Sequence, residues 1–245
     1  MALALVATAA LLVGIVVGAG SPAVRSPRAA SFVPDGYFGA LRALAGTGPR
    51  SLSAAERAAE SRAIERTLAY TPYVRVAGAQ HREVALTFDD GPGPYTSQIV
   101  RELATLNAPG TFFEVGAEER YFSAGTAAVV EHGFPVGDHT ESHKPMSTLS
   151  VKLQREQLIE DADAIGDYGA PFPHMFRPPY GVWNATTLAL LRQYRMLMVL
   201  WTVDTSDYLQ PGVPTIVARA LDGARPGAII LLHDAGGDRA QTVAA

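Results

Sequence analysis

From about residue 83 to the last residue, segments with the hydrophobic pattern of strands alternate with segments that have the pattern of helices. Short runs of strand-forming residues bounded by turn residues predict strands, and longer segments with apolar residues three or four positions apart predict helices. The predicted strands are VALTF (84–88), TFFEVG (111–116), FPVGDH (134–139), HMFRPPYG with its turn (174–181), MLMVLWTVD (196–204) and GAIILLHDAG (227–236). The predicted helices are SQIVRELATLN (97–107), AAVVEHG (127–133), VKLQREQLIEDADAIGDYG (151–169), NATTLALLRQY (184–194) and PTIVARALDGA (214–224). The alternation of strand and helix indicates an α/β fold with a parallel sheet, open or closed.

Residues 1–22 form a nearly continuous apolar segment, MALALVATAALLVGIVVGAG followed by Ser21 and Pro22. Such a segment is typical of a secretory signal peptide or of an uncleaved membrane anchor. It predicts an extracytoplasmic protein that is secreted or attached to the membrane through residues 2–19. No basic residue precedes Arg25, whereas a signal begins with basic residues, so we expect the natural start to lie upstream.

Residues 23–82 predict a linker followed by an N-terminal helical extension. Small residues, proline and arginine dominate the first part, which is typical of a loosely ordered linker. In SAAERAAESRAIERTLAY (53–70), Ser53 with Glu56 three positions later matches a capping box at the start of a helix.

Composition excludes several classes of partner and site. The chain has 245 residues, of which 48% are hydrophobic and 18% charged, and this balance suits a sizeable core. The net charge is −4 and no basic run is present, which argues against nucleic acid as a partner. The chain has no cysteine, so it forms no disulfide, and a metal would be bound by imidazole and carboxylate groups. The sequence does not set the oligomeric state.

Polar residues of unusual type follow the predicted strands at their ends. They are Asp89 with Asp90, His139, residues 177–180, Asp204, and His233 with Asp234. Active sites of parallel α/β folds lie at the carboxyl ends of the strands. A sheet that closes into a barrel would bring all of these residues to one rim.

Two short stretches indicate metal chemistry. His139 and His143 in HTESH are four positions apart, which on a helix places both imidazoles on one face. Asp89 and Asp90 are neighbouring carboxylates that repel each other, and a cation or a proton-transfer role explains such a pair. Two histidines and one carboxylate leave a coordination position for water, as in catalytic zinc sites. Taken singly, the same residues also fit a helix surface and an N-cap with a turn.

Five stretches occur in the order of the five motifs of the polysaccharide deacetylase family, carbohydrate esterase family four, which the chain therefore resembles. They are TFDDGP (87–92), HTESH (139–143), RPPYG (177–181), DTSDY (204–208) and LLHD (231–234). The resemblance covers residues 83–245 and implies a catalytic domain with a distorted (β/α) barrel and an Asp-His-His metal site. Members of the family continue beyond the equivalent of GGDRAQTVAA, so we expect the barrel to lack its last helix and strand.

The resemblance implies a metal-binding or catalytic role for seven residues. The implied metal ligands are Asp90, His139 and His143. The implied catalytic residues are Asp89 as general base, Arg177 as the group that holds this base, His233 as the general acid that protonates the leaving amine, and Asp204 as the aspartate that orients the arginine. Taken singly, Arg177 also fits an ordinary ion pair and His233 a hydrogen-bonded core histidine.

The resemblance also implies contacts with the substrate. The backbone N–H of Tyr180 matches a donor to the oxyanion, and Leu231 matches an apolar wall of the acetyl pocket. Trp201 fits either the core or the lining of the substrate groove. The fourth motif ends in Tyr208 where the family has Trp, which keeps an aromatic wall but changes the shape of the groove.

The function implied by the resemblance is metal-dependent removal of N-acetyl groups from N-acetylglucosamine units of a cell-wall glycan or a chitin-like polysaccharide. The implied cofactor is zinc, with cobalt, nickel or manganese as alternatives. An O-deacetylase acting on acetylated xylan remains an alternative, because the same hydroxide attack would hydrolyse either an amide or an ester carbonyl. A glycan-binding protein without turnover is a third interpretation, against which the intact motif residues argue.

Overall fold

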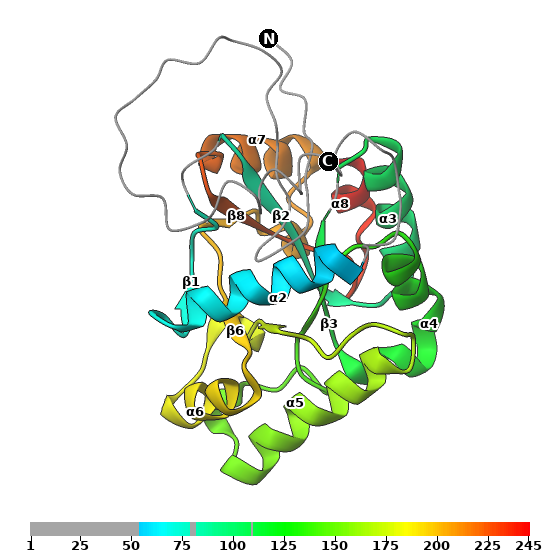
Figure 1. Cartoon of the computed structure of the whole chain (residues 1–245). Helices are drawn as coiled ribbons and strands as arrows, with labels where there is room; N and C mark the ends of the chain where they lie inside the picture. Colours follow the sequence, from blue (N-terminus) through cyan, green and yellow to red (C-terminus); the bar gives the residue numbers. More distant parts are fainter. Residues whose placement is uncertain (1–53, 79–81, 109) are drawn as a thin grey trace, which may run out of the picture.

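The computed structural model describes residues 54–78, 82–108 and 110–245. Within these residues, eight strands form one sheet in the order β1-β6-β5-β4-β3-β2-β8-β7. Strands β1, β2, β3, β6 and β8 are labelled in Figure 1. All neighbouring strands are parallel. The strands are β1 (Tyr73–Val74), β2 (Val84–Gly91), β3 (Thr111–Glu114), β4 (Val136–Asp138), β5 (Met175–Phe176), β6 (Leu197–Val199), β7 (Val203–Asp204) and β8 (Ala228–His233).

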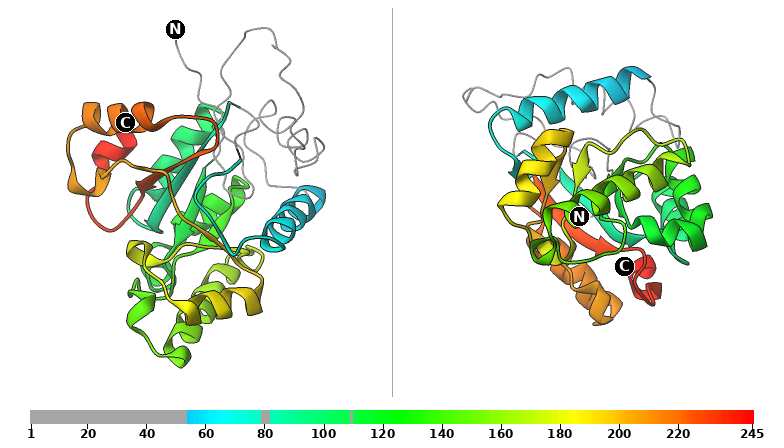
Figure 2. Two further views of the ribbon diagram at one scale, coloured as in Figure 1. Left: turned by 90° about the vertical axis from the view of Figure 1, so that its left-hand side faces the viewer. Right: turned by 90° about the horizontal axis from the view of Figure 1, so that it is seen from below.

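Helices connect the strands and lie around the sheet in the view from below (Figure 2, right). They are α2 (Ala54–Leu68), α3 (Thr96–Thr105), α4 (Gly116–Glu131), α5 (Val151–Gly166), α6 (Ala185–Tyr194), α7 (Val213–Gly223) and α8 (Ala240–Ala244). Short 3₁₀ turns are η1 (Met146–Thr148), η2 (Pro179–Gly181) and η3 (Asp207–Leu209). Side-chain caps fix two helix starts, since Ser150 accepts from the first turn of α5 and Asn184 forms a capping box at α6.

Strand β2 is buried on both faces. Val84, Leu86 and Phe88 pack in an outer cluster together with apolar residues of α3 and α4. The alternate residue Ala85 packs in an inner cluster with side chains of β3, β6 and β8. Because side chains alternate along a strand, Asp89 lies on the same inner face as Ala85. This two-sided burial explains why the strand reads as a continuous apolar run before its aspartates.

The sheet curls into a distorted barrel. After edge strand β1, Val76 forms an antiparallel bridge with Ala228 at the start of β8, which lies near the other edge of the sheet. Helix α2 covers the interior, because Ile64 and Leu68 pack in the inner cluster with Ala85. The predicted distorted (β/α) barrel is thereby confirmed, with α2 as its cover at the amino ends of the strands.

The structure divides one predicted element, extends a second and adds a strand that was not predicted. The run MLMVLWTVD divides into β6 and β7, because Leu200 N donates to Val74 O (2.9 Å) and Thr202 N donates to Ile229 O (3.0 Å). The helix predicted at AAVVEHG is the second half of the longer α4, which has a non-helical residue at Phe122. Strand β1 was not predicted, and it joins the sheet from within the predicted extension 23–82.

The predicted signal or anchor at residues 1–22, and the linker up to residue 53, lie outside the described residues. The helix predicted at 53–70 is present as α2. In the described part of the chain, no helix combines the length and the apolarity needed to cross a membrane.

Candidate active site

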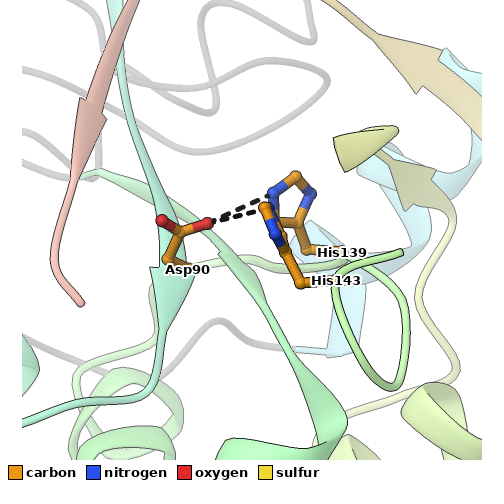
Figure 3. A group of neighbouring side chains, drawn as sticks. All are labelled: Asp90, His139 and His143. Carbon is orange, nitrogen blue, oxygen red and sulfur yellow. Dashed lines mark ion pairs between the residues drawn. The ribbon is translucent and has the colours of Figure 1, made fainter. Parts of the chain in front are cut away.

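Asp90, His139 and His143 converge at the carboxyl ends of β2 and β4. Oδ1 of Asp90 lies 3.1 Å from Nε2 of His143 and 3.6 Å from Nε2 of His139. One ligand atom from each group lies within 4.8 Å of the other two, and both imidazoles face the same carboxylate (Figure 3). Two imidazole nitrogens and one carboxylate oxygen at such distances fit a divalent metal of the zinc type.

The two histidines lie in a loop, so the helix suggested by their spacing is wrong. This loop joins β4 to η1, and its residues Thr140 and His143 have positive φ angles of 74° and 51°. Thr140 N donates to Oδ1 of Asp138 (2.9 Å), and Glu141 N donates to the carbonyl of Gln157 (2.9 Å). These bonds fix the loop to β4 and α5, and the resulting loop shape brings both imidazoles to one side.

Buried hydrogen bonds orient His139. Its Nδ1 lies 2.7 Å from the carbonyl oxygen of Arg177, which can only accept, so in the neutral ring Nδ1 carries the proton and Nε2 keeps its lone pair. Its backbone N–H donates to the carbonyl of Glu114 (2.8 Å) and to Oδ2 of Asp161 (2.9 Å). The ring is therefore held with its free nitrogen toward Asp90, an arrangement typical of metal-binding histidines.

Arg177 is fully buried and holds Asp89 in place. Its Nη1 donates to Oδ1 of Asp89 (2.6 Å) and to Oγ1 of Thr87 (2.9 Å), and its Nε donates to the carbonyl of Val199 (3.0 Å). The guanidinium lies over the ring of Phe113, with Cζ 4.1 Å from the ring centroid. Burial lowers the pKa of Arg177, and the charge of Asp89 opposes this shift. The pair fixes the direction of the Asp89 carboxylate at the rim.

Strand β8 places His233 directly across from Asp89. Asp207 holds His233 twice: its Oδ1 lies 2.7 Å from Nδ1 of the ring, and its Oδ2 accepts from the backbone N–H at 2.8 Å. Thr242 of α8 donates to the same Oδ2 at 2.7 Å. Burial would lower the pKa of His233, but the hydrogen bond and charge of Asp207 raise it above its ordinary value. The ring thus favours its protonated form and keeps Nε2 unengaged.

Asp204 does not orient Arg177, so its predicted role is corrected. Its side chain is exposed, and its Oδ1 accepts from Ser206 N at 2.7 Å. The carboxylate on Arg177 is Asp89, and the carboxylate of the DTSDY motif that enters the site is Asp207. The motif contains two aspartates, and its spacing alone does not reveal that η3 turns the second one toward His233.

Two exposed tyrosines flank the site. Tyr180 of η2 has a φ of 59°, and its ring centroid lies 4.8 Å from that of His143. The ring centroid of Tyr208 lies 5.3 Å from that of His233. The tyrosine that stands where the family has Trp therefore contacts the predicted general acid.

The two remaining predicted substrate contacts, Leu231 and Trp201, are less exposed than Tyr180 and Tyr208. Leu231 is buried on β8, two residues before His233. Trp201 is half-buried, packs against the inner cluster, and lies with its ring centroid 5.8 Å from Cζ of Arg177. Trp201 therefore belongs mainly to the core that surrounds Arg177.

The charges around the ligand set favour a cation. Burial would raise the pKa of Asp90, but its contacts with His139 and His143 outweigh burial and hold the pKa far below its usual value. Burial would lower the pKa of His139, but the charges of Asp89 and Asp90 raise it. A site that stabilises positive charge on the imidazole of His139 also suits a bound metal ion.

Comparison with known proteins identifies the family. The family profile described as polysaccharide deacetylase matches residues 77–199. The chain belongs to the polysaccharide deacetylase family. One relative, a chitooligosaccharide deacetylase of Rhizobium leguminosarum bv. trifolii, is 35% identical over 64% of this chain and 74% of that protein. A peptidoglycan-N-acetylglucosamine deacetylase of Bacillus cereus is 36% identical over 66% of this chain and 77% of its own length.

A solved structure extends the comparison to three dimensions. The Bc1960 peptidoglycan N-acetylglucosamine deacetylase superposes with a TM-score of 0.69 at 30% identity, over 73% of this chain and 84% of that chain. Fold and family therefore agree with the resemblance that the five motifs carry.

Proposed function

We propose that this chain removes N-acetyl groups from N-acetylglucosamine units of a cell-wall glycan or chitin-like polymer by metal-dependent hydrolysis. The observation that carries the proposal is that a metal-ligand set, a candidate base and a candidate acid lie together at the carboxyl ends of the strands. A ligand set of Asp90, His139 and His143 lies beside Asp89, and His233 lies across from Asp89 on the next strand.

Asp90, His139 and His143 would hold the metal, and zinc suits two imidazoles and one carboxylate. A bound zinc ion supplies Lewis acidity that activates water and polarises the acetamide carbonyl. The donor set fits this role, because the bond from Nδ1 of His139 to the carbonyl of Arg177 directs Nε2 toward the ligand set and Oδ1 of Asp90 faces both rings.

Asp89 is proposed as the general base. Arg177 occupies its Oδ1, while its Oδ2 lies 3.8 Å from Nε2 of His139, on the side of the ligand set. This oxygen can take a proton from the attacking water, and the arginine keeps it in that direction.

His233 is proposed as the general acid. An amine leaves only when it is protonated, and the raised pKa of His233 keeps a proton available near neutral pH. Asp207 holds Nδ1, so the proton to be transferred is the one on Nε2.

Further roles follow for the groups around this centre. The backbone N–H of Tyr180 is proposed to stabilise the oxyanion, and Leu231 is proposed to line the acetyl pocket. The exposed ring of Tyr208 is proposed to border the sugar groove. The apolar segment 1–22 would carry the enzyme out of the cytoplasm as a signal or hold it at the membrane through residues 2–19, which agrees with a cell-wall substrate.

The test is acetate release from an N-acetylglucosamine oligomer, with added zinc and with chelator. Zinc-dependent release that Asp89→Asn abolishes is expected. Zinc binding without release from this oligomer would contradict N-deacetylation. Release from acetylated xylan in the same preparation would then establish the O-deacetylase, whereas binding of glycan without either release would establish a non-catalytic role.

A further inference from the structure

Arg239 is buried and bonded to the backbone of its own turn. It is 3% exposed, and its guanidinium donates to the carbonyls of Ala235 (2.6 Å), Gly236 (2.9 Å) and Asp238 (3.1 Å). None of the ion pairs found among the described residues includes Arg239. A buried charge needs good partners, so the carbonyls of this turn are what stabilises the side chain in its position.

The same turn lies against a metal ligand. Gly236 has a φ of 72°, and a Cβ added to it would lie 2.5 Å from Oδ2 of Asp90 and 3.3 Å from the Asp90 Cβ. The backbone of Gly236 therefore forms a wall on the Oδ2 side of Asp90. The other oxygen, Oδ1, faces the imidazoles of His139 and His143. A shift of this wall would let the carboxylate rotate or move away from the rings.

We propose that Arg239 is a positioning residue for the metal site. It fixes the turn of residues 235–238 so that Gly236 rests against Asp90 and Oδ1 stays directed at the two imidazoles. Arg239 lies outside the five motifs, and the inference rests on the proposed metal-dependent function. Partners that orient metal ligands typically change metal affinity by about 10–100-fold when they are removed.

The first test compares two arginine variants of the full chain. Arg239→Gln should weaken zinc binding by about 10–100-fold, as measured by competition with a chromophoric chelator. Arg219→Gln is the matched control, because Arg219 also donates to a loop carbonyl, that of Thr205 (2.8 Å), but does not border Asp90. Its zinc affinity should equal that of the parent chain. Melting curves of both variants establish that they are folded.

The second test compares two glycines with positive φ angles and does not depend on the folding of Arg239→Gln. Gly236→Ala places a methyl group against Asp90, whereas Gly169→Ala, with a φ of 81° and no neighbouring atom within 4 Å of the added Cβ, carries a similar backbone strain outside the turn of residues 235–238. Gly236→Ala should weaken zinc binding and change the visible absorption of the cobalt-loaded chain. Gly169→Ala should leave both close to those of the parent.

Each outcome decides the proposal. Parent-like zinc affinity in folded Arg239→Gln, or equal losses in Gly236→Ala and Gly169→Ala, would overturn it. A parent chain that binds no zinc would overturn the proposal together with the proposed cofactor. Zinc binding without acetate release would overturn the proposed function alone, because the affinity measurements do not depend on turnover.

Discussion

Asp89 on β2 and His233 on β8 are paired residues of adjacent parallel strands. Each is held by a different buried partner, Asp89 by Arg177 and His233 by Asp207. The ladder of β2 and β8 therefore fixes the spacing between the proposed base and the proposed acid, because both side chains belong to rigid strands. The imidazole ligands come instead from the loop after β4, whose shape depends on hydrogen bonds to α5 and β4.

Asp89→Asn should lower acetate release by about 10²–10⁴-fold, because an amide does not accept the proton of the attacking water. Its Oδ1 can still accept from Arg177, so we expect the fold and the zinc affinity to be retained. Asp90→Asn is the contrasting variant and should lose zinc, because it removes a ligand. Steady-state rates and zinc titration of both variants check this division, and equal losses of zinc affinity would contradict it.

Asp207→Asn should move the alkaline limb of the pH–rate profile to lower pH. His233 must be protonated to act, and the carboxylate of Asp207 raises the pKa of His233, so removal of this charge lowers the pKa. Asp204→Asn is the control, because Asp204 is exposed and bonded to Ser206. Its profile should match that of the parent. A shift in Asp204→Asn but not in Asp207→Asn would show that Asp204, and not Asp207, raises the pKa of His233.

Strand and helix periods predict most of the barrel, because β2, β3, β8 and helices α3, α5, α6 and α7 each bury a regular apolar face. The periods do not predict β1, which is two residues long and is defined by pairing with β6 far along the chain. The ligand set was found from adjacent aspartates and paired histidines, yet the helix proposed for HTESH is a loop. The spacing of residues along the chain does not reveal the long-range hydrogen bonds that shape such loops. For the same reason it does not show which of Asp204 and Asp207 contacts His233.

The cover of the barrel formed by α2 leads to a prediction about stability. Ile64 is 2% exposed and packs in the inner cluster, so Ile64→Ala should lower the free energy of unfolding by about 2–5 kcal/mol. Tyr121→Ala is the control, because this side chain on α4 is 78% exposed and should change the free energy by less than about 0.5 kcal/mol. Denaturant unfolding of both variants checks this. Equal effects would show that α2 does not support the barrel.

Buried carboxyl groups should make the metal-free chain more stable in mild acid than at pH 8. Asp234 is fully buried, accepts a hydrogen bond from Thr96, and burial raises its pKa to about 7. Between about pH 4 and pH 7, the native state therefore holds a proton that the unfolded chain has released. The corresponding stabilisation, on the order of 4 kcal/mol, is present below about pH 4 and is lost as the pH rises through about 7.

Asp234→Asn isolates this contribution, because an amide of similar shape does not titrate. In chelator-treated protein, the variant should resemble the parent near pH 4 and be the more stable of the two at pH 8. Groups such as His233, whose raised pKa acts in the same direction, remain in both proteins and cancel in the difference. Urea unfolding at several pH values measures it. A difference between parent and variant that does not change with pH would show that Asp234 is ionised in the native state throughout this range.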